Sequence, residues 1–114
     1  MISRAHRFHG YGSLTRVYRQ GDIVRGPICS IKYLHNSKRS TYRLAVVVSK
    51  KVSKSAIVRN RIRRRVFEAV RHQETKIKGP YDIVITVFHE NMATIPHEEL
   101  RTIIRSQLSQ ASLI

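Results

Sequence analysis

The side chains with the clearest chemical purpose are basic, and they are concentrated in residues 50–65, a stretch without Asp or Glu. Arginine predominates there, and its planar guanidinium binds phosphate oxygens through paired hydrogen bonds. A merely solvated helix surface would carry acids three or four residues from each cation, and only Glu68 can reach Arg64 or Arg65 in this way. We therefore favour a phosphate-binding surface over a solvated one. Its predicted members are Lys50, Lys51, Lys54, Arg59, Asn60, Arg61, Arg63, Arg64 and Arg65.

The charge of the whole chain also indicates a polyanionic partner. Its 22 Lys and Arg against 7 Asp and Glu give a formal net charge of +15 over 114 residues, and the sequence pI is about 11.1. The excess is uneven, because 18 of the basic residues and only 2 of the acidic ones fall in residues 1–72. Nucleic acid is therefore the leading class of partner.

Residues that could catalyse a reaction directly are scattered along the chain. The candidates are His89-Glu90, His97-Glu98, the pair His6 and His9, and the pair Asp22 and Asp82. Neither His-Glu pair has a second His at zinc-protease spacing, and the two early histidines lack a third ligand. The two aspartates suit caps or turns better than a catalytic carboxylate pair. We expect no catalytic group, metal or cofactor site in the protein itself.

A long helix must position the basic stretch, from about Ser55 to Gln73. Its apolar residues recur at helical spacing and form one stripe that would dock on a core. The stripe consists of Val58, Ile62, Val66, Ala69 and Val70. Phe67 is predicted on the opposite face with Asn60 and Arg64, where burial against the core would be awkward.

The remaining pattern predicts a single domain over 1–114, with a flexible basic arm at 1–12. Ser13 would cap a helix ending at Gly21, and Thr94 would cap the last one. Strands are expected over about 28–33, 42–48 and 83–88, the last of them buried, with a further short one near 23–24. The first two would form a hairpin, with 42–48 as a central strand covered on both faces. The fold class is α+β, an α/β sandwich of about four strands in one sheet with three helices, in the order α-β-β-β-α-β-α.

Other features bear on location. No uncharged apolar run approaches the ~20 residues that span a bilayer. The basic N-terminus has no apolar segment behind it, and the lone Cys29 cannot form an internal disulfide. We expect a cytoplasmic protein without a membrane partner. Self-association stays open.

The basic stretch resembles a known motif. Ser49-Lys50-Lys51 and Arg59-Asn60-Arg61-Ile62-Arg63-Arg64, after a strand reading Leu44-Ala45-Val46-Val47-Val48, are similar to the "RNR" region of the bacterial ribonuclease P protein subunit. The likeness extends before it to Arg7, Leu14, Val17, Tyr18 and Gly21, and after it to Tyr81-Asp82-Ile83-Val84-Ile85. It covers roughly residues 7–108.

The resemblance implies a chain topology and separate roles for the protein and the RNA subunit. The RNR helix would lie in an unusual left-handed crossover between parallel strands. The protein would bind the ribonuclease P RNA through the basic residues above and assist it in releasing the 5′ leader of precursor tRNA. The RNA subunit would hold the catalytic Mg²⁺ ions, and the protein would bind no cofactor of its own.

A second surface follows from the same resemblance. The family's cleft for the single-stranded leader lies between the first helix and the sheet, which places Leu14, Tyr18, Ser30 and Lys32 in it. Leu14 lacks the aromatic face that stacking on a base requires, so it is also a candidate for core packing. Phe67 stands where the family usually has a basic residue, and we add it to the leader-binding set as a stacking candidate.

Two alternatives share the basic helix. One is a ribosomal or other structural RNA-binding protein with no role in cleavage. The other is a DNA-binding helix that reads the major groove through Asn60 and Arg61.

Overall fold

The computed structural model describes residues 11–114, with side chains from Leu14 onward, so the predicted arm at 1–12 lies almost wholly outside the described residues. The order of elements is the one expected. They are α1 (Tyr11–Gln20), β1 (Asp22–Arg25), β2 (Cys29–His35), β3 (Arg43–Val47), α2 (Ala56–Arg71), the short 3-10 helix η2 (Glu74–Lys76), β4 (Tyr81–Val87), the 3-10 helix η3 (Glu90–Ala93) and α3 (His97–Gln110).

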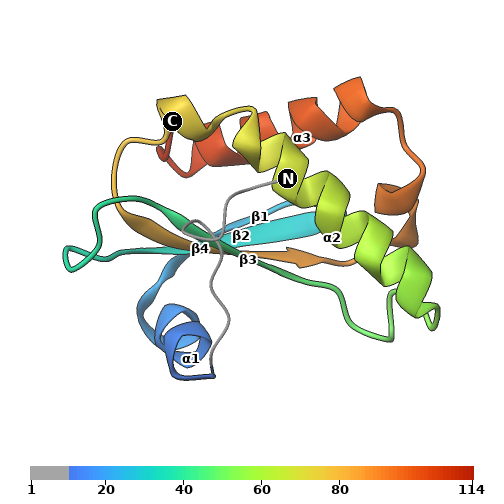
Figure 1. Ribbon diagram of the computed structural model, residues 1–114, viewed down its shortest axis with the longest axis horizontal. Coiled ribbons are helices and arrows are strands. Elements are labelled where there is room, and N and C mark those ends of the chain that lie inside the picture. Colours follow the sequence, from blue (N-terminus) through green and yellow to red (C-terminus); the bar gives the residue numbers. More distant parts are fainter. Residues whose placement is uncertain (1–10) are drawn as a thin grey trace.

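One mixed sheet organises the described residues. Its strand order is β1-β2-β4-β3, with β3 parallel to β4 and the other pairs antiparallel. Helix α1 covers one face of the sheet, and α2 and α3 cover the other (Figure 1). The predicted α+β sandwich is confirmed. Helix α2 connects the parallel strands β3 and β4, and the left-handed sense of that crossover stays a prediction.

Two predictions about the strands were wrong. The segments 28–33 and 42–48 do not form a hairpin, because β4 lies between β2 and β3. Consequently β3 is an edge strand and β4 is the central one. A pattern of apolar residues reports burial, and β3 is buried on both faces although it has a neighbour on one side only.

Two predicted helix caps also differ. Ser13 lies inside α1, which begins at Tyr11, and Thr94 ends η3 instead of starting α3, whose N-cap is Pro96. Helix α2 is capped by Ser55, whose hydroxyl accepts a hydrogen bond from the Val58 amide at 3.3 Å. Capping residues are common in ordinary turns as well, so the residue type alone does not fix a helix boundary.

The apolar side chains form one cluster on each face of the sheet. The larger one lies under α2 and α3 and contains Ile31, Ile62, Ile83 and Ile104, all fully buried. The smaller one joins Val17 of α1 to Ala45 and Val84 of the sheet. Alternating residues of each strand thus serve opposite layers, as the pleat requires.

The end of α1 is held close to β2. A Cβ atom at Gly21 would lie 2.5 Å from the Val17 carbonyl oxygen and 2.8 Å from that of Tyr33. Any other residue would push the two elements apart. Gly21 therefore sets the distance between α1 and the sheet.

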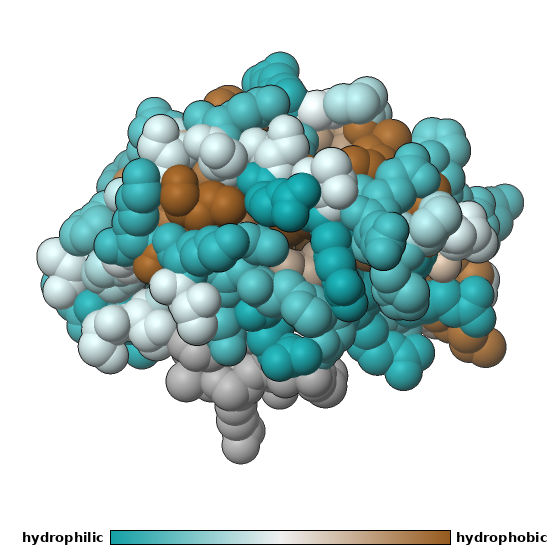
Figure 2. Space-filling model, turned by 90° about the horizontal axis from the view of Figure 1, so that it is seen from above, coloured by the Kyte–Doolittle hydropathy of each residue, from teal (hydrophilic) through white to brown (hydrophobic). Residues whose placement is uncertain are grey.

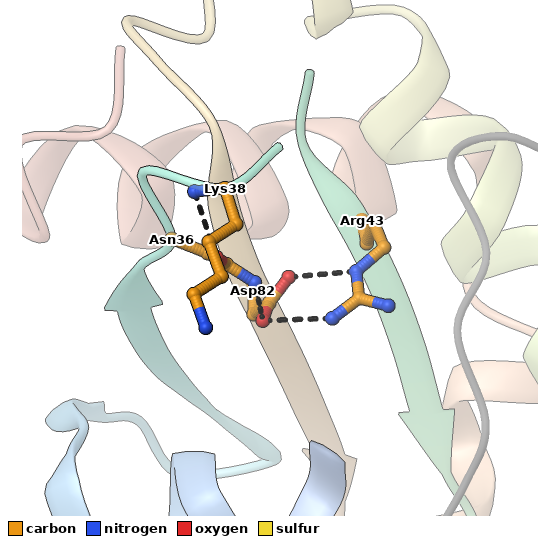
Figure 3. A network of polar contacts seen from close by, with 4 residues as sticks. All are labelled: Asn36, Lys38, Arg43 and Asp82. Atoms are coloured by element: carbon orange, nitrogen blue, oxygen red, sulfur yellow. Dashed lines mark hydrogen bonds and ion pairs between the residues drawn. The ribbon is translucent and has the colours of Figure 1, made fainter. Parts of the chain in front are cut away.

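A buried carboxylate joins three segments at one end of the sheet (Figure 3). Asp82 accepts hydrogen bonds from Arg43 Nε at 2.8 Å, Arg43 Nη2 at 2.9 Å and Asn36 Nδ2 at 3.0 Å. Asn36 in turn accepts one from the Lys38 amide at 3.2 Å. The predicted turn or cap role of Asp82 is corrected, because it lies within β4 and pairs the two parallel strands.

Candidate nucleic-acid interface

Helix α2 presents the basic residues on the side away from the sheet. It contains six arginines and one acid, Glu68, while Ile62, Val66, Ala69 and Val70 are buried as predicted. Lys50, Lys51 and Lys54 are exposed in the loop that leads into the helix. The predicted basic residues therefore form one continuous region of the surface, which we call the α2 surface.

The members of the α2 surface are not equivalent. Arg59 Nη1 donates to the carbonyl oxygens of Ser53 at 2.9 Å and Lys54 at 3.2 Å, which fixes the loop before the helix. Arg65 donates to the carbonyl oxygens of Met92, at 2.8 Å, and Ile95. These two arginines contribute to the fold as well as to the charge.

Arg61 and Arg64 have no such internal role. Both are exposed, and neither forms a hydrogen bond or ion pair with any residue in 11–114. Arg63 is half-buried and donates to the Asn60 side chain. Arg61 and Arg64 are thus the cations of α2 best placed to contact phosphate.

The surface over α2 and α3 is mainly hydrophilic. Figure 2 looks down onto these helices and shows apolar residues only in separate patches between hydrophilic ones. A phosphate-rich partner suits such a surface, because protein–nucleic acid interfaces are more polar and more positively charged than protein–protein interfaces.

The opposite face of the sheet carries a second group of side chains. Lys32 Nζ donates to the Tyr18 carbonyl oxygen at 2.6 Å and lies 5.4 Å from the centroid of the Tyr18 ring. Tyr18 as a whole residue is 43% exposed. The structure therefore brings together an aromatic face and a cation at the edge of α1, as expected.

The other predicted leader-binding residues are placed differently. Leu14 is half-buried and packs on the small cluster with Val17, consistent with its alternative role in the core. Ser30 was expected on an open surface, but it is only 6% exposed. Its short side chain lies between Arg25 of β1 and Thr86 of β4, its partners in the sheet.

Two apolar residues on this face were missed. Ile23 pairs with Lys32 across the sheet and is 40% exposed, and Phe88 is 52% exposed although strand 83–88 was predicted to be buried. Phe88 continues the alternation of Val84 and Thr86, and its amide donates to the Ile28 carbonyl oxygen at 2.8 Å. We call Tyr18, Ile23, Lys32 and Phe88 the leader strip. The period-2 pattern of β4 could have identified Phe88.

The position of Phe67 overturns its prediction. Phe67 was predicted to point away from the core, but it is half-buried and packs against the larger apolar cluster. On a helical wheel it lies beside Val70, the edge of the buried stripe, so a long ring can turn inward. Phe67 also lies on the α2 side of the sheet, and so it cannot join the leader strip.

The described residues give little support to a metal site or a membrane span. No three His, Cys, Asp or Glu side chains within 11–114 are grouped so that they could hold a metal ion. None of the helices in this part of the chain is long and apolar enough to cross a bilayer. The pair His6 and His9, which was not expected from the sequence to be a metal site, lies outside the described residues.

A four-stranded mixed sheet between one helix and two, with an arginine-rich helix on its surface, defines a small α/β sandwich with a strongly basic side. The model of the family described as "Ribonuclease P" matches residues 2–112. The chain is similar to the ribonuclease P protein component of Pseudanabaena sp., with 33% identity covering 100% of this chain and 97% of the relative. The corresponding protein of Chloroflexus aurantiacus is 34% identical, with 99% and 82% covered.

Solved structures agree with the fold. The RNase P protein of Staphylococcus aureus superimposes with a TM-score of 0.84 at 22% identity, covering 96% of this chain and 98% of that one. The Thermotoga maritima protein gives a TM-score of 0.81 at 20% identity, covering 91% and 96%. The chain therefore belongs to the ribonuclease P protein family. It is a protein subunit of this endoribonuclease of tRNA processing, and this family favours neither the ribosomal nor the DNA-binding alternative.

Proposed function

We propose that this subunit binds two RNAs on opposite sides of its sheet. The α2 surface contacts the ribonuclease P RNA, and the leader strip contacts the 5′ leader of precursor tRNA. The RNA subunit holds the catalytic Mg²⁺ and performs the cleavage, in the cytoplasm. The single observation that carries the proposal is the separation of two chemically different surfaces by one sheet.

The α2 surface suits a folded, phosphate-rich RNA. Within residues 11–114 its cations meet few acids, so an RNA that approaches it replaces counterions instead of breaking internal ion pairs. Neutralised phosphates also reduce the repulsion between the RNA subunit and its RNA substrate. We therefore expect the protein to lower the Mg²⁺ concentration that cleavage requires.

The leader strip suits an unpaired strand. Exposed rings such as Tyr18 and Phe88 offer faces for bases, and Lys32 supplies a cation for the backbone. Stacking on an aromatic side chain contributes about 1–3 kcal/mol per base and tolerates any sequence. This chemistry matches a leader, whose sequence differs from one tRNA to the next.

A reconstitution experiment tests the proposal. Precursor tRNA, with and without a leader, is cleaved or bound by a bacterial-type RNA subunit at limiting Mg²⁺, with and without the protein. We expect the protein to stimulate cleavage and to increase affinity only for the leader-bearing RNA. Equal affinity for precursor and mature tRNA would overturn the leader assignment.

A further inference from the structure

A pocket of about 450 Å³ lies between the middle of α2 and the turn that precedes α3. We propose that it holds one unstacked nucleotide of the RNA subunit, with the phosphate on Arg61 and the base on an apolar floor. This inference rests on the proposed function and refines its α2 surface. The residues that line the pocket are Arg61, Arg65, Ala93, Thr94, Ile95, Pro96 and His97.

Two arginines form the cationic wall of the pocket, and only one of them, Arg65, is held in place by hydrogen bonds within residues 11–114. Arg65 is held by the carbonyl oxygens of Met92 and Ile95, so its guanidinium plane is fixed against the turn. Arg61, one helical turn earlier, has no partner within residues 11–114. A phosphate at the mouth would bind Arg61 while Arg65 keeps the wall in place.

The two positive charges of Arg61 and Arg65 lie on the same side of the pocket and favour the binding of an anion. Burial, and then the nearby Arg61 charge, lower the pKa of the Arg65 guanidinium. Among the described residues no Asp or Glu lines the pocket, and Glu98 and Glu99, which follow His97 in the chain, are not part of its lining. A bound phosphate would relieve the repulsion between the two arginines.

The remaining walls suit a base and not a second phosphate. Ala93, Ile95 and Pro96 offer apolar surface, and the Thr94 hydroxyl and His97 ring are exposed polar groups beside them. Aromatic bases gain from apolar contact on their faces and from hydrogen bonds at their edges. The volume also falls within the ~300–1,000 Å³ of small-molecule sites, which fits a single nucleotide.

Mononucleotide binding tests the pocket without the RNA subunit. The backbone amide signals of the full chain are followed by NMR during titration with adenosine monophosphate, adenosine or inorganic phosphate. We expect adenosine monophosphate to shift the amides of residues 93–97 at concentrations at least tenfold lower than either fragment. Equal shifts with inorganic phosphate would indicate a plain anion site, and no shifts in this segment would equally overturn the proposal.

Filling the pocket tests its role in the complex. Thr94→Trp places a bulky neutral side chain in the pocket, and Ser106→Trp adds the same side chain to the exposed surface of α3 as a matched control. We expect Thr94→Trp to weaken binding to the ribonuclease P RNA at least tenfold, and Ser106→Trp to bind as wild type. Thermal unfolding confirms that both variants fold.

The outcomes separate this inference from the function on which it rests. Wild-type affinity in a folded Thr94→Trp variant would overturn the nucleotide pocket and leave the α2 surface intact. Absence of RNA binding by the wild-type protein would overturn the proposed function itself.

Discussion

Lys32 lies over the ring of Tyr18, with its ammonium nitrogen 5.4 Å from the ring centroid and 2.6 Å from the Tyr18 carbonyl oxygen. The two residues are 14 positions apart in the chain and belong to α1 and β2. One face of the ring is occupied by a cation, and the exposed part is left for another planar group. This contact fixes the orientation of the aromatic side chain on which the leader assignment depends.

We predict that Tyr18→Ala weakens binding of leader-bearing precursor tRNA to the holoenzyme by about 1–3 kcal/mol, because one stacking face is lost. Tyr18→Phe retains the ring and should bind as wild type. Mature tRNA should bind all three proteins equally, in the same titration. An equal loss for precursor and mature tRNA would mean that Tyr18 supports the fold and not the leader.

The double variant Arg61→Ala and Arg64→Ala should weaken binding to the RNA subunit and reduce its dependence on salt. The expected change in the slope of log K against log salt is about 0.7–0.9 per lost phosphate contact. Arg101→Ala with Arg105→Ala removes the same charge from exposed positions of α3 and serves as the control. Identical slopes for the two double variants would show that only net charge matters.

Two phenylalanines should respond in opposite ways. Phe67→Ala should lower the free energy of unfolding by about 2 kcal/mol, less than the ~3–5 kcal/mol of a fully buried ring, because Phe67 is only half-buried. Phe88→Ala should leave stability nearly unchanged and weaken leader binding. Denaturant unfolding and precursor-tRNA titration measure the two effects. A stable Phe67→Ala variant with weakened RNA binding would restore the stacking hypothesis for Phe67.

Stability should depend on the ionisation of Asp82. Burial raises its pKa, but the hydrogen bonds from Arg43 and Asn36 outweigh burial and hold the pKa below its ordinary value. A depressed pKa in the folded state stabilises the protein above the unfolded-state value, about pH 4, and this contribution is lost as pH falls through the folded-state pKa.

The matching variant is Asp82→Asn. It should cost about 3–5 kcal/mol at pH 7, because the mostly buried ion pair between Arg43 and Asp82 is lost. The variant should also lack the decline in stability below about pH 4 that Asp82 causes in the wild type. Urea unfolding at several pH values provides both readings. Parallel pH profiles for the two proteins would contradict the assignment.

The purified protein should not cleave precursor tRNA at any Mg²⁺ concentration, yet should stimulate the RNA subunit when Mg²⁺ is limiting. The measurement is the rate of leader release with and without RNA subunit. RNA-free cleavage that disappears on replacing Asp22, Asp82 or a histidine would place the chemistry in the protein instead.

Local sequence determined much of this protein. The apolar stripe of α2 and its arginines occupy neighbouring positions of one helix, so the 3.6-residue period alone assigns them to opposite sides. The polyanionic partner was predicted from composition alone, because the excess of basic residues does not depend on the fold. The RNR pattern then predicted the family, and the family brought the expectation of a leader site at Tyr18 and Lys32.

Tertiary structure decided what depends on contacts between distant segments. β4 inserts between β2 and β3 although it follows both in the chain, and no local period records that choice of neighbour. Phe67 and Phe88 were each assigned to the wrong environment, because a ring at the edge of a buried stripe or at the end of a strand turns toward whatever space its neighbours leave. Arg59 and Arg65 likewise look like Arg61 and Arg64 in sequence. The difference comes from packing. The loop before α2 supplies carbonyl oxygens to Arg59, and the turn before α3 supplies them to Arg65. Within the described residues, Arg61 and Arg64 receive none and stay available to RNA.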